Sequence, residues 1–310
     1  MKYIFGPVPS RRLGRSLGID PIPDKTCNFQ CIYCQLGRTT SFTNERQVFF
    51  PVEDILSELS DAIQENEDNF DYITLVGSGE PTLYGDLASL LEGVKKLSEK
   101  PICVITNGSL LHDENVQDAL MLADVVLPTL DAGDEKMFIK INRPHPSLKY
   151  EDVVGGFLEF RRKFKGKFWV EIMLMRDIND TKEELSKLKE KIDLIQPDRI
   201  DINVPIRPPV EEWVKVPDTE VLASLSEAFR DVKDINFPEM GKFKSYTGNF
   251  EEELLNIIAR HPMRQDQILQ TFLSEKLEKT DILKRLEILQ SSGKIRARRY
   301  NEALYWGIVR

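Results

Sequence analysis

Short apolar runs alternate with longer amphipathic stretches over the first three quarters of the 310-residue chain. The short runs predict buried strands, and apolar residues at helical spacing predict the helices between them. The expected strands are 16–22, 71–76, 102–105, 124–127, 168–175 and 199–204. The expected helices are one that opens at Pro51, then 87–97, 112–122, 150–164, 181–195 and 218–232. This alternation predicts an α/β fold with a partial parallel (β/α)6 barrel, in which chemistry takes place at the C-terminal strand ends.

The pattern changes near residue 236, where a segment with Pro238 and Gly241 interrupts the alternation. Three helical segments follow, and then an alternating hairpin about Asn301 and Glu302. Their expected bounds are 250–260, 264–272, 280–292, 294–300 and 303–309. Three helices and a hairpin resemble a small winged-helix-like α+β domain. The expected domains are a barrel of residues 1–235, a linker of 236–247 and a winged-helix-like domain of 248–310.

Three of the four cysteines, Cys27, Cys31 and Cys34, lie within eight residues. Clustered thiolates suit a soft metal centre, and three of them leave one metal of a cubane cluster open for another ligand. A zinc site is the alternative, although such sites usually recruit a His or a fourth Cys, and neither occurs between Gly6 and Gly77. The isolated Cys103 is expected to be a small buried hydrophobe.

The spacing Cys27-x3-Cys31-x2-Cys34, with Tyr33 before the last cysteine, resembles the signature loop of the radical S-adenosylmethionine (SAM) superfamily. Residues 6–37 further resemble the iron-sulfur oxidoreductases related to tRNA wyosine-base (4-demethylwyosine) synthases. The resemblance implies that the three cysteines hold a 4Fe-4S cluster and that SAM chelates its fourth iron. It also implies reductive cleavage of SAM to a 5'-deoxyadenosyl radical that abstracts a hydrogen atom from the substrate, with an electron donor such as flavodoxin or ferredoxin.

The same resemblance assigns further residues to SAM. Gly77-Ser78-Gly79-Glu80-Pro81 resembles the Gly-Gly-Glu motif of the family, so Gly79 and Glu80 are expected to position the methionyl amine. Glycine there would let a ligand approach the backbone closely. Tyr33 is expected near the adenine, and the other candidate SAM contacts are Thr106, Asn107, Thr129 and Asp131. The alternative for Asp131 is N-capping of a helix that begins at Asp134. No catalytic residue for the substrate is identified.

Several charged residues are expected near the barrel mouth. Arg11, Arg12 and Arg15 either form a solvated edge or bind a carboxylate or phosphate. Arg207 lies on a Pro-rich loop suited to presenting a fixed cation, and Glu171 in an apolar strand is either functional or salt-bridged. The histidines His112, His145 and His261 have no partner in the sequence, so solvated or packing roles are expected.

The net charge of −9 is unevenly distributed. Residues 248–310 hold 11 Lys+Arg against 9 Asp+Glu, so this part carries +2 and residues 1–247 carry −11. An acidic barrel argues against nucleic-acid binding over a wide face, but the tail remains a candidate. Lys294, Arg296, Arg298 and Arg299 would lie on the wing. They either contact phosphates or belong to a module that docks on the barrel or on a protein partner.

The expected activity is therefore that of a radical SAM enzyme with one cluster, acting on a small molecule or a protein side chain. One alternative is a tRNA-modifying enzyme, but archaeal wyosine-base synthases carry extra cysteines for a second cluster, whereas this chain has only Cys103 left. The other is a nucleic-acid-binding regulator that senses SAM or redox state. No apolar run reaches membrane length, and residues 1–10 contain Gly6, Pro7 and Pro9 rather than a signal sequence. A cytoplasmic protein without membrane contact is expected.

Overall fold

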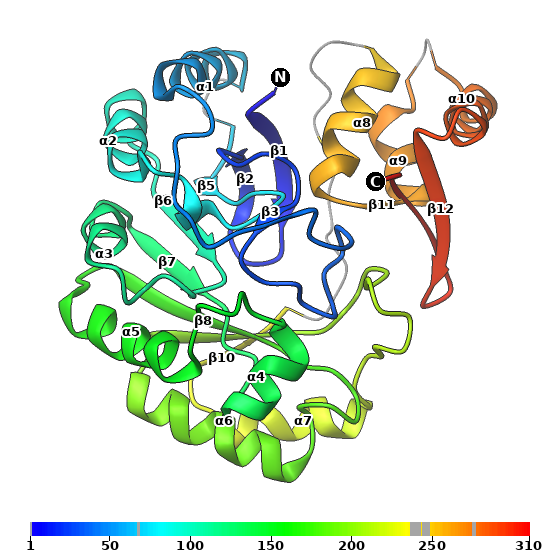
Figure 1. The fold of residues 1–310 in the computed structure, drawn as a ribbon. Coiled ribbons are helices and arrows are strands. Elements are labelled where there is room, and N and C mark those ends of the chain that lie inside the picture. The colour runs from blue at the N-terminus through cyan, green and yellow to red at the C-terminus, as the bar shows by residue number, and fades with distance from the viewer. Residues whose placement is uncertain (1, 67–68, 236–242, 244–248, 275–276) are drawn as a thin grey trace.

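A curved sheet wrapped by helices forms most of the molecule, and a small second domain lies beside the first strands of this sheet (Figure 1). The computed structural model describes residues 2–66, 69–235, 243, 249–274 and 277–310, apart from the side chains of 226–228. Among these residues, no helix is long and apolar enough to cross a membrane.

Eight strands form the large sheet in the described part of the chain, in the order β1-β2-β5-β6-β7-β8-β9-β10. Strands β1 and β2 are antiparallel, and every other neighbouring pair is parallel. The bounds are β1 (Ile4–Ser10), β2 (Gly14–Ile19), β5 (Tyr72–Leu75), β6 (Ile102–Thr106), β7 (Val125–Pro128), β8 (Lys167–Met173), β9 (Arg199–Asn203) and β10 (Val232–Asp234).

The expected α/β fold class is confirmed, since the six predicted strands correspond to β2 and β5 to β9. Both edges of the sheet differ from the prediction. Strand β1 was missed because Pro7 and Pro9 interrupt its pattern, although an edge strand tolerates proline. At the other edge, the helix predicted to reach Val232 ends at Ala228, and Val232 begins the three-residue strand β10.

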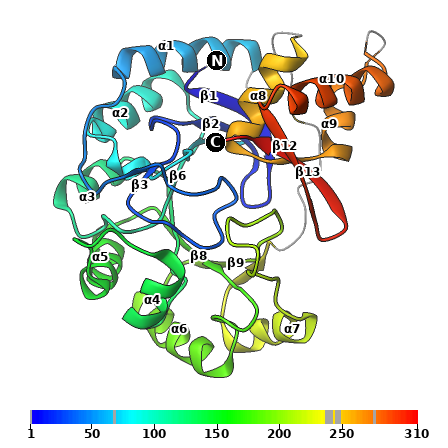
Figure 2. The ribbon, with the colours of Figure 1, turned by 45° about the vertical axis from the view of Figure 1, so that its right-hand side comes forward.

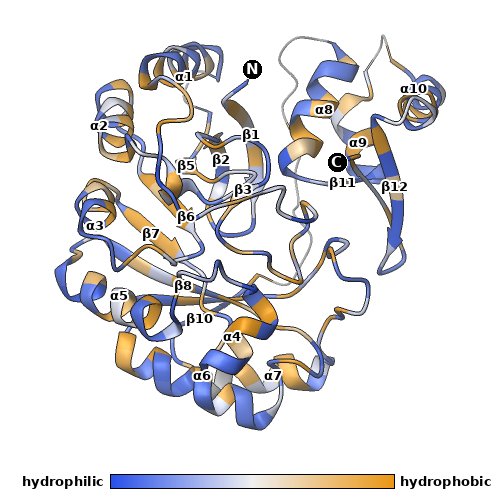
Figure 3. Ribbon diagram, in the orientation of Figure 1, coloured by the Kyte–Doolittle hydropathy of each residue, from blue (hydrophilic) through white to orange (hydrophobic). Residues whose placement is uncertain are grey.

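Helices cover the outer face of the sheet (Figure 1). They are α1 (Val52–Asn66), α2 (Leu87–Leu97), α3 (Glu114–Leu120), α4 (Glu135–Asn142), α5 (Tyr150–Lys163), α6 (Lys182–Ile195) and α7 (Thr219–Ala228), with the 3-10 turn η1 (Pro81–Leu83). Alternate strand residues, such as Ile73 and Leu75 of β5, pack into the main core between sheet and helices. The strands are accordingly largely hydrophobic, whereas the helices carry hydrophilic outer faces (Figure 3).

The inner face of the barrel carries a second, smaller apolar cluster. Leu13, Cys103 and Trp169 belong to this cluster, together with Val125 and Leu127. Cys103 is fully buried, whereas its neighbours along β6 belong to the main core, so it faces the opposite side of the sheet. The expectation that Cys103 is a buried hydrophobe is confirmed.

The C-terminal domain packs on the N-terminal hairpin (Figure 2). Its elements are α8 (Phe250–Arg260), β11 (Met263–Arg264), α9 (Gln265–Phe272), α10 (Lys279–Ser291), β12 (Ile295–Tyr300) and β13 (Ala303–Ile308). Phe5 and Val8 of β1 share one apolar cluster with the helices of this domain. The expected helices and hairpin are therefore present, whereas the predicted linker 236–247 lies outside the described residues except for the buried Phe243.

Candidate cluster, cofactor and substrate site

The three clustered cysteines lie on an irregular loop that begins at the short strand β3 (Thr26–Cys27), which pairs with β4 (Ser41–Phe42). Backbone hydrogen bonds hold this loop against the end of α4. The N–H groups of Gln30 and Ile32 donate to the carbonyl oxygens of Asn142 and Ile141, both at 2.9 Å. All three cysteines are partly buried. The loop is thus fixed by the barrel rather than projecting into solvent.

Nitrogen donors are directed at every one of the three sulfurs. The donor–sulfur distances are 3.2 Å from Lys25 Nζ to Cys34, 3.4 Å from the Phe29 N–H to Cys27, 3.5 Å from Asn142 Nδ2 to Cys31 and 3.8 Å from Asn107 Nδ2 to Cys27. Hydrogen bonds to ligating sulfurs are one of the means by which proteins tune iron-sulfur clusters. This donor set fits a cluster held by thiolates.

Burial favours the protonated thiols of Cys27 and Cys31 when no metal is bound. It raises the pKa of Cys27 to about 12, with Glu80 adding to the effect, and raises that of Cys31 as well, there with Asp131. Such thiols ligate as thiolates and release their protons on metal binding. Within the described ranges, no group of three His, Cys, Asp or Glu side chains converges on the position of a single metal ion. A cubane distributes its protein thiolates over separate irons.

Glu80 is buried and ties two strand ends together. Its Oε1 accepts from the N–H of Thr82 at 3.0 Å and from the hydroxyls of Thr82 and Thr106, both at 2.6 Å. Its Oε2 accepts from the N–H of Asn107 at 2.7 Å. The Asn107 side chain continues to Asn28 Oδ1 at 2.7 Å, inside the cysteine loop. Three of the predicted SAM contacts, Glu80, Thr106 and Asn107, therefore form one network beside Cys27.

Gly79 lies where the loop after β5 meets the strand that leads into Cys27. A Cβ atom at Gly79 would come within 1.7 Å of the carbonyl oxygen of Thr26, and the Glu80 N–H donates to the same oxygen at 3.0 Å. Glycine is therefore required by a contact within the chain, whereas the sequence suggested the approach of a ligand. A contact between Gly79 and SAM stays a prediction.

Asp131 is buried and holds Tyr33. Its carboxylate accepts from the Tyr33 hydroxyl at 2.7 Å, from Asn142 Nδ2 at 2.9 Å and from the Met173 N–H at 2.9 Å. Burial raises the pKa of Asp131 to about 6 despite these hydrogen bonds. The alternative role of Asp131 as a helix cap is wrong, because Asp134 caps α4 by accepting from the Met137 N–H. The position of Tyr33 beside adenine stays a prediction.

Thr129 joins the site through its backbone. Its N–H donates to the carbonyl oxygen of Thr106 at 3.1 Å, and it forms a β-bridge with Glu171. The predicted site residues thus gather at the C-terminal strand ends, as the barrel fold requires. Their roles toward SAM stay predictions.

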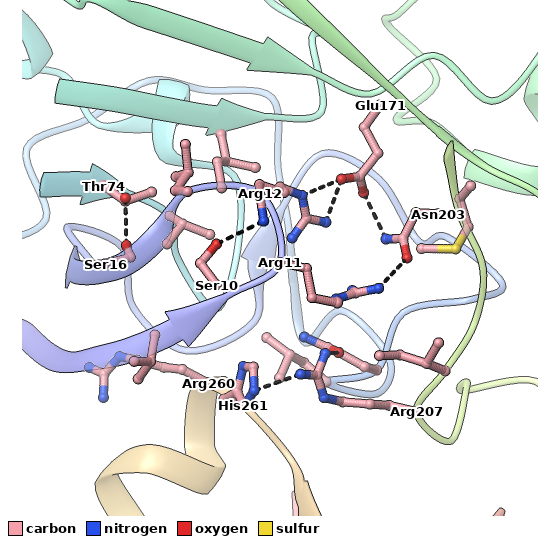
Figure 4. A pocket seen from close by; sticks show the side chains of 18 of the residues that line it. Ser10, Arg11, Arg12, Ser16, Thr74, Glu171, Asn203, Arg207, Arg260 and His261 are labelled. Atoms are coloured by element: carbon pink, nitrogen blue, oxygen red, sulfur yellow. Dashed lines mark hydrogen bonds and ion pairs between the residues drawn. The ribbon is translucent and has the colours of Figure 1, made fainter. Parts of the chain in front are cut away.

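A cavity of about 270 Å³ lies beside the cysteine loop and is lined in part by Tyr33 and Cys34. The β1–β2 hairpin, the loop after β9 and the end of α8 form much of its wall (Figure 4). The inner faces of the strands contribute Ser16, Thr74, Ile105, Glu171, Met173 and Asn203. The cavity therefore lies between the barrel and the C-terminal domain, in contact with the predicted cluster ligand Cys34.

Glu171 is a salt-bridged residue of the cavity wall. It forms an ion pair with Arg12 and accepts from Asn203 Nδ2 at 3.0 Å. Burial alone would raise its pKa, but Arg12 and these hydrogen bonds hold the pKa of Glu171 below its ordinary value. Arg11 and Arg12 line the cavity rather than forming a solvated edge, and their binding of a carboxylate or phosphate stays a prediction. Arg15 instead lies outside, exposed and 3.8 Å from Asp71.

Arg207 also lines the cavity and joins three parts of the chain. It donates to Gln35 Oε1 at 2.7 Å, and its Nη2 lies 2.6 Å from His261 Nε2 (Figure 4). The predicted fixed cation is therefore present. The expectation for His261 was a solvated or packing role, whereas this residue lies on the cavity wall because the C-terminal domain folds back onto the barrel.

Several residues at the site were not predicted as part of it. Lys25 lies two positions before Cys27, and Gln35 directly follows Cys34, so both had a signal in nearby sequence. Asn142 and Arg260 lie far from the cysteine loop in the sequence. The contacts of these two depend on the docking of segments that are far apart in the chain.

Comparisons with known proteins agree with this geometry. The model of the Radical SAM superfamily matches residues 22–189. A Brachyspira hyodysenteriae protein named GTPase Obg is 38% identical over 314 residues, which cover 99% of this chain and 45% of that protein. This chain spans less than half of that protein, so the name GTPase Obg also describes parts of the relative that this chain does not match. A UPF0026 protein of Methanocaldococcus jannaschii is 38% identical over 288 residues, 91% of this chain and 88% of the relative.

Solved structures with the same fold include Streptococcus suis SuiB bound to S-adenosylmethionine. It has a TM-score of 0.51 and 17% identity, and the alignment covers 73% of this chain and 50% of SuiB. A structure of TYW1 with a lysine-pyruvate adduct bound aligns at a TM-score of 0.47 and 15% identity, over 95% of this chain and 81% of TYW1. The first shows the fold alone, and the second score is too low to place the chain in a branch. The matched model, the cysteine loop and the curved parallel sheet together establish that this chain belongs to the radical SAM superfamily, whose enzymes use a 4Fe-4S cluster and S-adenosylmethionine.

Proposed function

We propose that this chain reductively cleaves SAM at a single 4Fe-4S cluster and that the resulting 5'-deoxyadenosyl radical removes a hydrogen atom from a small molecule bound in the cavity. Cys27, Cys31 and Cys34 would hold the cluster. The observation that carries the proposal is the shared wall, because Cys34 and Tyr33 line the same cavity as the inner faces of the strands. A molecule in that cavity would lie next to the cofactor site.

The chain's own residues would bind, orient and exclude water. Lys25, Asn107 and Asn142 donate toward the cysteine sulfurs and would stabilise the thiolate charge. Glu80 holds the backbone of Asn107 and the loop after β5, where the resemblance expects the methionyl amine. The end of α8 lines one side of the cavity, which would limit the access of water to a reactive intermediate.

The size of the cavity supports a small substrate. Its volume of about 270 Å³ lies just below the usual range of about 300 to 1,000 Å³ for ligand pockets, so it suits a small metabolite or a single side chain. The base-paired stem of a tRNA would not enter this cavity.

The C-terminal hairpin supports the same preference. Arg298 donates to the Pro209 carbonyl oxygen, and the Tyr300 hydroxyl donates to that of Pro205, so part of the expected wing faces the barrel. Lys294 pairs with Glu251 within its own domain. The order helix, strand, two helices and hairpin supports a winged-helix-like domain. We infer that it docks on the barrel rather than serving as a free nucleic-acid reader.

Anaerobic reconstitution tests the proposal. Protein loaded with iron and sulfide should hold about four irons per chain. With SAM and dithionite it should form 5'-deoxyadenosine and methionine in equal amounts. A SAM-sensing regulator would instead bind SAM and return it intact. Iron-loaded protein that leaves SAM uncleaved under these conditions would overturn the proposed activity.

A further inference from the structure

Two arginines of the C-terminal domain reach the segments that carry the predicted cofactor residues. Arg260 is the last residue of α8 and lies beside β1, with its guanidinium carbon 5.4 Å from the centre of the Phe5 ring (Figure 4). Arg310 follows β13. Only 14% of each arginine side chain is exposed. Both side chains therefore lie within the contact between this domain and the barrel.

Arg310 joins the two ends of the cysteine loop. Its Nε and Nη2 donate to the two carboxylate oxygens of Asp24 at 2.7 and 2.8 Å, and its Nη1 donates to the carbonyl oxygen of Leu36 at 2.8 Å. Asp24 precedes the first cysteine of the loop, and Leu36 follows the last. Nη2 also donates to the carbonyl oxygen of Ala259 in α8. One side chain thus ties both ends of the loop to the C-terminal domain.

Arg260 reaches the turn 77–81 through Asp20, a buried residue directly after β2. One oxygen of Asp20, Oδ2, accepts from Arg260 Nε at 2.8 Å and from the N–H and the hydroxyl of Ser78 at 3.2 and 3.0 Å. A Cβ atom at Gly77 would come within 2.6 Å of Asp20 Oδ1, so the turn packs directly on this carboxylate. Removal of Arg260 would leave a buried carboxylate without this cation, at the base of the turn that carries Glu80.

The turn and the cysteine loop form one hydrogen-bonded unit. The Lys25 N–H donates to the carbonyl oxygen of Ser78 at 3.1 Å, and the Glu80 N–H donates to that of Thr26 at 3.0 Å. The two arginines therefore act on the same unit from two points. An isolated exposed ion pair contributes little, but a shielded guanidinium fork with a further carbonyl partner holds its geometry closely.

We propose that Arg260 and Arg310 are positioning residues of the cofactor site. Through them the C-terminal domain holds the cysteine loop and the turn 77–81 in the arrangement that receives the cluster and SAM. The inference rests on the proposed function and assigns this domain a part in the same site. Linkage makes the effect reciprocal, so a bound cluster also strengthens the docking of the domain.

Hydrogen exchange in the cluster-free, full-length protein tests the inference at Arg310. The N–H groups of Cys34 and Gly37 donate within the loop at 3.1 and 3.3 Å, so exchange of the peptide 26–37 reports on the opening of the loop. Arg310→Gln should raise this exchange about tenfold, the effect of losing one charged hydrogen bond. Exchange in α5 is the internal reference and should not change, because a global loss of stability would raise exchange in both places.

Two measurements on the reconstituted protein extend the test to the cofactors. Iron release to a chelator should be about tenfold faster from Arg310→Gln than from the unaltered protein, because a loop that opens more often exposes the cluster more often. Arg260→Gln should raise the dissociation constant of SAM about tenfold, because the turn 77–81 loses its support through Asp20. The change that SAM causes in the paramagnetic signal of the reduced cluster measures this constant.

Matched variants keep the test decisive. Arg299→Gln changes an exposed arginine of the same domain and should alter none of the three quantities. Arg310→Lys keeps the charge but loses the fork, so its exchange and its iron release should be intermediate. If Arg310→Gln fails to fold by circular dichroism, Asp24→Asn removes the same ion pair from the barrel side, with the same expected changes.

Equal increases of exchange in α5 and in the peptide 26–37 would make Arg310 a general stabilising residue and overturn the inference. Unchanged exchange in Arg310→Gln, or iron release equal to that of Arg299→Gln, would overturn it as well. An unchanged SAM dissociation constant in Arg260→Gln would overturn the role of Arg260.

Cleavage of SAM by the unaltered protein is measured separately, and the exchange experiment needs no cluster, so the two proposals stay apart. A protein that cleaves SAM without the exchange response retains the proposed function and loses this inference. A protein that shows the response but leaves SAM intact loses only the proposed function.

Discussion

The two sides of the barrel mouth are built in opposite ways. On the cofactor side, the predicted cluster ligands and Glu80 lie on two short contiguous segments, the loop from Cys27 to Cys34 and the turn 77–81 after β5. The cavity side is assembled from distant parts of the chain. The hydrogen bond from Arg11 to Asn203 spans 192 positions, and the contact of Arg207 with His261 joins two domains.

This difference separates what a local motif can encode from what only the whole fold can encode. A cluster needs ligands at fixed short spacing, so one loop supplies them. A substrate cavity needs walls from several strand ends, so its residues come together only when the barrel closes. The docking of the C-terminal domain adds a further wall. Substitution of a cluster ligand should therefore abolish activity, whereas substitutions in the cavity wall should reduce binding or stability by degrees.

The largest expected effect is on the cofactor side. Cys31→Ala should abolish cluster binding and SAM cleavage, because two thiolates cannot hold the cubane at this loop. Cys103→Ala is the matched control, since this cysteine lies in the separate apolar cluster inside the barrel. Iron content after anaerobic reconstitution measures both. Loss of iron in Cys103→Ala would contradict a single cluster with three ligands.

Glu80→Gln should weaken SAM binding by about one to two decades, the value of a charged hydrogen bond of roughly 1.5 to 3 kcal/mol. The carboxylate also accepts from Thr82, Thr106 and Asn107, so the variant disturbs the loop that is expected to hold the methionyl amine. Thr82→Val removes one of these donors and should have a smaller effect. Equilibrium SAM binding to the reconstituted protein measures the change, and an unchanged dissociation constant would limit Glu80 to a structural role.

Glu171→Gln should lower the free energy of unfolding of the cluster-free protein at pH 7 by about 2 kcal/mol, because it removes the carboxylate paired with the partly exposed Arg12. The folded-state pKa of Glu171 lies below its ordinary value of 4.5. Its stabilisation is therefore present above pH 4.5 and is lost as the pH falls through the folded-state pKa. Urea unfolding should show the gap between the two proteins narrowing in acid, and a widening gap would refute this assignment.

Tyr300→Phe should cost about 1 kcal/mol of stability, because it removes the hydrogen bond from the hairpin to Pro205. Arg299→Gln, an exposed change on the same strand, should cost nothing measurable. Thermal unfolding compares the two. Equal stabilities would show that the hairpin contact does not hold the domain on the barrel.

The smallest expected effect concerns nucleic acid. Filter binding of total tRNA should give no micromolar retention near physiological salt, because the barrel is acidic and Arg298 already contacts it. If tRNA does bind, affinity should fall with salt at a log-log slope of about −0.7 to −0.9 per phosphate contact. Flattening of that slope in an Arg298→Gln, Arg299→Gln double variant would favour the tRNA-modifying alternative.

Regular periodicity made much of the fold predictable. The bounds predicted for α2 (87–97) and α8 (250–260) agree with the structure at both ends. The hairpin turn at Asn301 and Glu302 was also located, and both residues have positive φ there, 45° and 65°. Strand β1 was not predictable because prolines mask its pattern, and β10 was not because three residues carry no periodicity.

The cofactor side of the site was predictable from the sequence, whereas the arrangement of the cavity was not. The cysteine loop and the Glu80 turn follow from contiguous residues. The sequence indicated Arg11 as a candidate anion-binding residue and Arg207 as a fixed cation. It could not place the two in one cavity, nor place His261 on the wall of that cavity. That placement depends on β1 pairing with β2 and on the C-terminal domain packing against β1, which are tertiary contacts.

The most direct test of the account is transfer of deuterium into 5'-deoxyadenosine. The reconstituted enzyme, SAM and dithionite would be mixed with fractions from deuterium-labelled cells, separated into small anions, small neutral molecules, tRNA and protein. The account predicts that 5'-deoxyadenosine gains deuterium with one of the two small-molecule fractions. Transfer only from tRNA or protein would contradict it.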